Sequence, residues 1–313
     1  MTKAVFAMLM LCMTTLTAVA ADDVQLQKRV ALSFDDAPKK DGPVFVGDQR
    51  AEVLLDALQR ANTGPVVFYV TTSHFEIPGG RKRIERYAAA GHLIANHSHS
   101  HVWANRTDTA LYIDDVDQAE DLLAGFDNRR AWFRYPYLDE GRSVEKRDTI
   151  RAALDERNLK NGYVTIDNYD WYLDAKWKEA VDAGRSVDVA ALRDVYVEML
   201  LGAVNFYNDV ALESLNTSPA HVMLLHENDV AASFIGDLVA ALRDDGWTII
   251  DPDEAYSDPI AEQVPETLLT GQGRVAALAV DAGHDNRRLT HLAIEEDQID
   301  ALLAKRKVFA DAD

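Results

Sequence analysis

The chain has 313 residues, 52 acidic side chains against 32 Lys and Arg, a formal net charge of −20, and one cysteine. So acidic a surface repels nucleic acid and anionic lipid, and neither is expected as a partner. One cysteine allows no disulfide within the chain, so stability must come from a hydrophobic core, for which the length is sufficient.

The first twenty residues have the pattern of a secretory signal peptide. Lys3 is followed by an apolar run, Ala4–Leu16, and then by the small residues Ala18–Ala20. A basic end, an apolar segment and small residues around a cleavage point are typical of an exported protein. The run is shorter than the ~20 apolar residues that cross a bilayer. We therefore expect residues 1–20 to be cleaved and the mature protein to be secreted or periplasmic, without a membrane anchor.

Beyond this segment, short apolar runs alternate with longer helical ones. The expected strands are Arg29–Phe34, Val66–Thr71, Leu93–Asn96, Ala131–Arg134, Tyr163–Ile166, Val222–Leu225 and Trp247–Ile250. The expected helices are Arg50–Ala61, Arg81–Ala90, Thr109–Leu123, Val144–Arg157, Val187–Tyr207 and Val230–Asp245. This alternation predicts an α/β fold with a parallel sheet, and about seven strands favour a TIM-like (β/α)7 barrel over an open sheet. In such barrels the chemistry lies at the carboxyl ends of the strands.

The pattern changes after Asp258, where prolines and glycines interrupt any long element until a late helix at Glu295–Lys305. We interpret residues 21–258 as the main domain and 259–313 as a short C-terminal extension packed on it. His284 and His291 lie in this extension, where nothing near them in sequence resembles a site, and they are expected to be surface or packing residues.

The first expected strand runs into two adjacent carboxylates, Asp35 and Asp36. Because neighbouring side chains on a strand point in different directions, one could bind a cation while the other handles a proton. An acidic turn that caps the next element is the alternative.

The third expected strand ends in a histidine-rich tract, Asn96–His101. His97 and His101 share a face if the segment begins a helical turn, whereas His97, His99 and His101 share one if it stays extended. Two imidazoles and one carboxylate are a plausible zinc set that leaves a position open for water.

Three further strand ends carry polar or aromatic groups. They are Arg134, the segment Asp167–Trp171 with its two carboxylates and tryptophan, and His226. Each has an ordinary explanation when taken alone, such as a surface ion pair or a buried histidine. Together they put acid, base, metal-binding and aromatic groups at successive strand ends, which indicates an enzyme active site.

Five of these segments resemble, in order, the motifs of the polysaccharide deacetylase family, whose catalytic unit is the NodB homology domain of carbohydrate esterase family four. Ser33–Ala37 is similar to T-F-D-D-G, His97–His101 to H-S/T-x-x-H, Arg134–Tyr137 to R-x-P-Y, Asp167–Trp171 to D-x-x-D-W, and Leu224–His226 to L-x-H. The resemblance extends to about Ser257 and implies a distorted barrel of about seven strands. Ala37 stands where the family has glycine, which would cause strain if its φ were positive.

The resemblance implies a cation site and a catalytic base. Asp36, His97 and His101 would hold one divalent metal ion, with zinc as the default and cobalt, nickel or manganese as alternatives. Asp35 would be the general base, kept ionised by Arg134. His99 would be a bystander.

It also implies a catalytic acid and an acetyl pocket. His226 would be the general acid, oriented by Asp170. The backbone N–H of Tyr137 would stabilise the oxyanion, and Leu224 and Trp171 would enclose the acetyl methyl group.

We therefore expect a metal-dependent hydrolase that removes N-acetyl groups from N-acetylglucosamine-type residues of a polysaccharide or oligosaccharide, peptidoglycan-like or chitin-like. An O-acetyl esterase of the acetyl-xylan type is a close alternative. An amidohydrolase acting on a non-sugar amide is a weaker one, because its H-x-H pair usually lies on the first strand. A non-enzymatic carbohydrate-binding protein would not need Asp35, Arg134 and His226 together.

Overall fold

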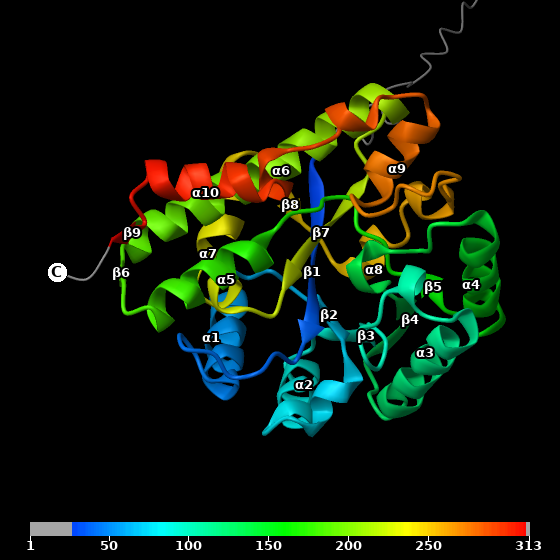
Figure 1. The fold of residues 1–313 in the computed structure, drawn as a ribbon, viewed down its shortest axis with the longest axis horizontal. Helices are drawn as coiled ribbons and strands as arrows, with labels where there is room; N and C mark the ends of the chain where they lie inside the picture. Colours follow the sequence, from blue (N-terminus) through cyan, green and yellow to red (C-terminus); the bar gives the residue numbers. More distant parts are fainter. Residues whose placement is uncertain (1–26, 311–313) are drawn as a thin grey trace, which may run out of the picture.

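The computed structural model describes residues 27–310, so the predicted signal peptide lies outside the described residues. A seven-stranded parallel sheet forms its centre, in the order β5-β4-β3-β2-β1-β7, with β8 paired to the start of β1 (Figure 1). The strands are β1 (Arg29–Ala37), β2 (Val67–Val70), β3 (Leu93–Asn96), β4 (Arg129–Phe133), β5 (Lys160–Asn161), β7 (Ala220–His226) and β8 (Thr248–Ile249). Val30–Phe34 of β1 are fully buried, as expected for a parallel strand covered on both faces.

The segment after β5 joins the two edges of the sheet. Asn161 pairs with Phe133 of β4, and five residues later Ile166 forms an isolated bridge to Met223 of β7. This closure makes the sheet a distorted, partial barrel, which confirms the expected fold class. The expected strand Tyr163–Ile166 is wrong: its side chains are buried as in a strand, but its backbone crosses from one edge to the other and pairs regularly with neither.

Helices cover the sheet (Figure 1). They are α1 (Gly47–Arg60), α2 (Gly80–Ala89), α3 (Thr109–Leu123), α4 (Val144–Glu156), α5 (Asp170–Asp182), α6 (Val189–Leu215), α7 (Asp229–Asp244), α8 (Pro252–Ala255), α9 (Arg274–Asp281) and α10 (Glu296–Lys305). The side chains of Asp108, Ser143 and Asn228 cap α3, α4 and α7 by accepting backbone N–H bonds, which explains where these helices begin. Within residues 27–310, no helix combines the length and apolarity needed to span a bilayer.

Two helices depart from the expectation. α5 was not expected, because its buried residues include Asp170 and Asp174 and so its hydrophobic periodicity is weak. Asp170 therefore begins a helix and does not sit at a strand end. α6 continues past Tyr207 to Leu215, where Asn216 in the left-handed conformation ends it.

The C-terminal segment packs against α6. Figure 1 shows α9 and α10 lying along this long helix, and the short strands β6 (Ser186–Val187) and β9 (Phe309–Ala310) pair antiparallel beside it. The His291 ring contacts Phe206 of α6 at 5.4 Å between centroids and covers Gly202, where a Cβ would come within 2.9 Å of the imidazole. His291 is thus a packing residue, and His284 is half-buried outside the cleft described below.

Candidate active site

The carboxyl ends of β1, β3 and β7 meet in one cleft of about 880 Å³. Eight of the residues predicted to form the site line it: Asp35, Asp36, His97, His101, Tyr137, Trp171, Leu224 and His226. The other two, Arg134 and Asp170, are 1% and 0% exposed and lie behind this lining, in contact with Asp35 and His226. The fold thus brings together residues separated by up to 191 positions, as parallel strands do at their carboxyl ends.

At the end of β1, the backbone turns the adjacent carboxylates of Asp35 and Asp36 in different directions. Asp36 has a φ of 63°, in the left-handed region that aspartate tolerates better than most residues. Asp35 points to Arg134, while Asp36 points to His101. The strain considered for Ala37 does not arise, because the positive φ falls one residue earlier and Ala37 is not among the positive-φ residues.

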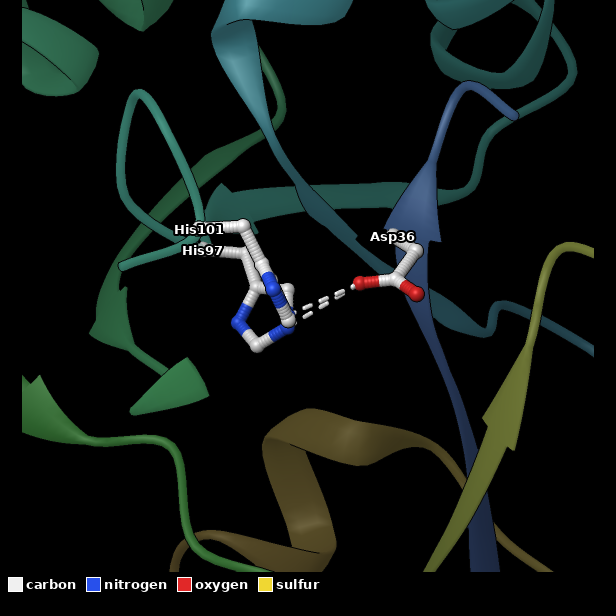
Figure 2. Close-up of side chains that lie close together, drawn as sticks. All are labelled: Asp36, His97 and His101. Carbon is white, nitrogen blue, oxygen red and sulfur yellow. Dashed lines mark ion pairs between the residues drawn. The ribbon is translucent and has the colours of Figure 1, made fainter. Parts of the chain in front are cut away.

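Asp36, His97 and His101 converge on one point. Figure 2 shows their side chains directed toward one another, with Asp36 Oδ1 3.6 Å from His97 Nε2 and 3.1 Å from His101 Nε2. One ligand atom from each lies within 4.8 Å of the others. Two imidazoles and a carboxylate are a donor set that fits a divalent cation such as zinc, with room for further ligands.

His97 is held in the tautomer that a cation site requires. Its Nδ1 lies 2.8 Å from the carbonyl oxygen of Arg134, which can only accept, so Nδ1 carries the proton and Nε2 keeps its lone pair. Burial lowers the pKa of His97 to about 4, so the imidazole is neutral at physiological pH.

His99 points away from this group. Its Nδ1 lies 2.9 Å from Thr72 Oγ1, and its Nε2 lies 3.1 Å from Gln118 Nε2. The segment therefore does not continue as a strand, and of the two alternatives for the histidine tract the structure selects the one that pairs His97 with His101.

Asp35 is locked by a buried arginine. Arg134 Nη1 donates to both carboxylate oxygens of Asp35, at 2.8 and 3.0 Å. The other guanidinium nitrogens bond Ser33 Oγ and Tyr256 Oη, each at 3.2 Å, and the carbonyl of Gly162. The carboxylate thus has a fixed orientation and a fixed countercharge at the edge of the cleft.

His226 forms an equally specific pair with Asp170. His226 Nδ1 lies 2.6 Å from Asp170 Oδ1, and Asp170 Oδ2 accepts from the backbone N–H of His226 and from Asn228 Nδ2. Burial opposes protonation of His226, but the charge and hydrogen bond of Asp170 outweigh it and raise the pKa. The imidazole therefore keeps its second proton to higher pH than a free histidine does, and Nδ1, not Nε2, faces Asp170.

Aromatic side chains form the walls of the cleft. Tyr137 is 51% exposed, and its ring lies 4.6 Å from both His101 and Trp103. Its φ of 58° places the residue in the left-handed region, which sets the direction of its backbone N–H. Trp171 is 37% exposed and Leu224 is 6% exposed, and both line the same cleft.

Two further residues of the site carried no role in the sequence analysis. Lys39 Nζ lies 3.4 Å from Asp36 Oδ2, and the backbone N–H of Lys39 donates to Glu227 Oε2 at 2.6 Å. Glu227 is fully buried beside Tyr87 and Arg50 and ties the loop after β1 to the residue after His226. Only their position in the sequence could have indicated a role, since Lys39 lies two residues after the first motif and Glu227 lies one residue after the last.

Comparison with known proteins was made on sequence and on structure. Residues 22–156 match the model of the polysaccharide deacetylase family, and this span includes Asp35, Asp36, His97, His101 and Arg134. The match covers 135 of the 313 residues and makes this part of the chain similar to that family. The expected enzyme class, a hydrolase acting on carbon–nitrogen bonds other than peptide bonds, is thereby confirmed. No curated protein sequence matches the chain.

Three solved structures with similar folds are distant from this chain in sequence. A family 4 carbohydrate esterase from Streptomyces lividans is 18% identical over 73% of this chain and 95% of its own, with a TM-score of 0.47. The chitin deacetylase of Colletotrichum lindemuthianum is 20% identical over 71% and 86%, with a TM-score of 0.48. The peptidoglycan deacetylase of Bacillus subtilis is 18% identical over 72% and 88%, with a TM-score of 0.45.

Proposed function

We propose that this protein is a polysaccharide deacetylase that removes N-acetyl groups from N-acetylglucosamine-type residues of a peptidoglycan-like or chitin-like glycan in a metal-dependent reaction. The observation that carries the proposal is the content of one cleft. It holds an aspartate paired with arginine, a histidine paired with aspartate, and a group of two histidines and one aspartate between which a cation fits. Amide hydrolysis needs a base, an acid and an electrophile, and this cleft offers one candidate for each.

Asp36, His97 and His101 would hold the cation. When bound, a divalent cation supplies Lewis acidity toward the acetyl carbonyl and the attacking water. The neutral state of His97 and the tautomer fixed by the Arg134 carbonyl suit this role. The donor set favours zinc, with cobalt, nickel or manganese as substitutes.

Asp35 would act as the general base. Arg134 Nη1 donates to both of its oxygens, so the carboxylate is oriented before substrate binds. Asp35 Oδ2 lies 3.6 Å from His97 Nε2, which places the base next to the cation ligands without making it one of them. It would take the proton of the water that attacks the acetyl carbon.

The tetrahedral oxyanion would be stabilised by the backbone N–H of Tyr137. The left-handed backbone at this residue directs the amide independently of the helical turn around it. Leu224 and Trp171 would enclose the methyl group, since both present apolar surface to the cleft. A donor aimed at the developing charge is typically worth ~3–4 kcal/mol of barrier.

His226 would act as the general acid. An amine leaves poorly unless its nitrogen is protonated, so an amide substrate needs such a donor. Asp170 holds Nδ1 and raises the pKa of the imidazole, which leaves Nε2–H to be donated to the sugar nitrogen. The proton taken by Asp35 and the proton given by His226 balance the reaction of water with the amide.

An O-acetyl esterase of the acetyl-xylan type is the second candidate. The same base and cation site could cleave an ester, whose alkoxide leaves with less help from an acid. The buried Asp170–His226 pair favours the amide, because an ester has less need of it. A non-sugar amide is less well suited to an open cleft walled by exposed Tyr137 and Trp171.

We also propose that the protein acts outside the inner membrane. Support comes from the sequence pattern of residues 1–20 alone. A cell-wall or extracellular glycan would be accessible there.

Acetate release from a panel of polymers tests the proposal. Peptidoglycan, chitin oligomers, poly-N-acetylglucosamine and acetylated xylan are each incubated with the protein after chelation and again after addition of Zn²⁺, Co²⁺, Ni²⁺ or Mn²⁺. We expect release from an N-acetylated polymer that depends on added metal. Release from xylan alone would favour the esterase, and binding without release from any polymer would favour a non-catalytic protein.

A further inference from the structure

A second cavity of about 470 Å³ adjoins the catalytic cleft. The two hollows share Tyr137, Asp139, Arg142 and Gly271, so one continues into the other across these residues. Tyr137, with its half-exposed ring, stands at the junction. A ligand in the cleft can therefore extend into the second cavity without leaving the protein surface.

The far wall of this cavity comes from the C-terminal extension. Residues 268–272, Ala276, Val280 and Asn286 line it. All of them lie within residues 259–313, beyond the last segment that resembles a deacetylase motif, Leu224–His226. The wall is thus a feature of this chain's own extension.

The loop that forms the wall is anchored along its length. Thr270 Oγ1 donates to the carbonyl of Leu138 at 2.9 Å, next to Tyr137. Arg151 of α4 donates to the carbonyl of Pro265 at 3.0 Å. Asp281 of α9 accepts from the backbone N–H groups of residues 266 and 267, at 2.6 and 2.9 Å. A wall fixed in this way loses little conformational entropy when a ligand binds.

The lining has the chemistry that a sugar ring requires. Tyr137 offers an aromatic surface, and Leu269, half-exposed, offers an apolar one. Arg142, Gln272 and Asn286 supply hydrogen-bond donors and acceptors. Among residues 27–310 no hydrogen bond or ion pair of the Arg142 guanidinium is found, so it is available to a ligand. The volume falls within the ~300–1,000 Å³ typical of small-molecule sites.

We propose that this cavity is a subsite for a neighbouring sugar ring of the same glycan chain. The inference rests on the proposed function, because it assumes that an acetylated sugar lies beside Asp36, His97 and His101. The extension would then make the enzyme prefer oligomers over single sugars. Binding of the neighbouring ring would hold the acetyl group against the catalytic residues.

Gly271 gives the sharpest test. It lies at the junction, its φ is outside the left-handed region, and a Cβ there would meet no atom within 4 Å. Gly271→Trp should therefore fold normally and obstruct the passage. Gly125→Trp is the matched control, since Gly125 also has open space and an ordinary φ but precedes β4, at the opposite end of the barrel.

The readout is the ratio of kcat/KM on a hexamer of N-acetylglucosamine to kcat/KM on a single-ring acetylated glycoside. We expect Gly271→Trp, and the double variant Gln272→Ala/Asn286→Ala, to lower this ratio about tenfold, as the loss of one good contact does. Gly125→Trp should leave it at the wild-type value. An unchanged ratio in both cavity variants would overturn the subsite.

Calorimetric binding of an N-acetylglucosamine dimer separates this inference from the proposed function. If the wild type releases no acetate from any sugar, the proposed function fails, but tighter binding of the dimer than of the single-ring glycoside, abolished by Gly271→Trp, would still support the subsite. Equal affinity for the dimer and the single-ring glycoside in the wild type would contradict it.

Discussion

His97 donates from Nδ1 to the backbone carbonyl of Arg134, at 2.8 Å, while the guanidinium of the same arginine holds Asp35. One residue at the end of β4 thus orients both a candidate metal ligand and the candidate base. Its side chain sets the direction of the Asp35 carboxylate, and its main chain sets the tautomer of His97. Arg134 therefore determines how the candidate base Asp35 lies relative to the candidate metal ligand His97.

The metal set is tested by His97→Ala. We expect loss of bound metal together with loss of activity, because only Asp36 and His101 would remain as ligands. Metal content is measured by elemental analysis, and far-UV circular dichroism checks the fold. His99→Ala is the control and should retain its metal, since His99 bonds Thr72 and Gln118 instead. Full metal content in His97→Ala would disprove the assignment.

The base is tested by Asp35→Asn. Turnover should fall by ~100- to 10,000-fold, the usual contribution of a general base, while metal is retained through Asp36. The variant should also be less stable, because Arg134 would keep its buried charge without the countercharge; breaking such a pair typically costs ~3–5 kcal/mol. Activity at saturating metal and thermal unfolding measure the two effects. Loss of metal in this variant would instead make Asp35 a ligand.

The pH profile reports on the Asp170–His226 pair. Asp170 raises the pKa of His226, so the protonated acid persists to higher pH. Activity should decline on the alkaline side of that pKa, because His226 then loses the proton that it donates. Asp170→Asn removes the countercharge and should move the alkaline limb to lower pH. Asp167→Asn is the control. Burial raises the pKa of Asp167 to about 7, so titration of Asp167 could change the activity in the same pH range. A larger shift in Asp167→Asn than in Asp170→Asn would reassign the limb.

The acid role of His226 is tested by comparing leaving groups. His226→Ala should slow an N-acetyl substrate far more than an activated acetyl ester, whose leaving group needs no proton. The ratio of the two rate losses isolates proton donation from any structural effect. Equal losses on both substrates would mean that His226 only shapes the pocket.

Export is tested on the protein isolated from its native host. N-terminal sequencing should find a start near Ala21, because cleavage is expected after Ala20. The melting temperature should not respond to reductant, since Cys12 is removed with the signal peptide and no other cysteine is present. An intact Met1 would contradict this prediction.

Much of the fold and of the candidate site could be predicted from the sequence. β3 and α3 have the expected bounds, because continuous apolar burial and a clean Asp108 cap are local signals. Most candidate site residues could be named because their motifs lie within a few positions of a strand end, whereas Asp167–Trp171 follows the crossing segment and leads into α5. Local order along the chain was sufficient to place acid, base and ligand groups at the same edge of a parallel sheet.

Tertiary structure decided what depends on contacts between distant residues. Tyr163–Ile166 is apolar enough for a strand, yet it crosses between the barrel edges, and only packing reveals that. His99 and His101 have the same side chain two residues apart, and the left-handed turn at His101 selects which of them faces Asp36. The loop of Gly271 reaches the cleft from more than 100 residues beyond Tyr137, held there by Thr270 on the Leu138 carbonyl. The periodicity of apolar residues in the sequence does not predict such a contact, because the residues that form it meet only in the folded chain.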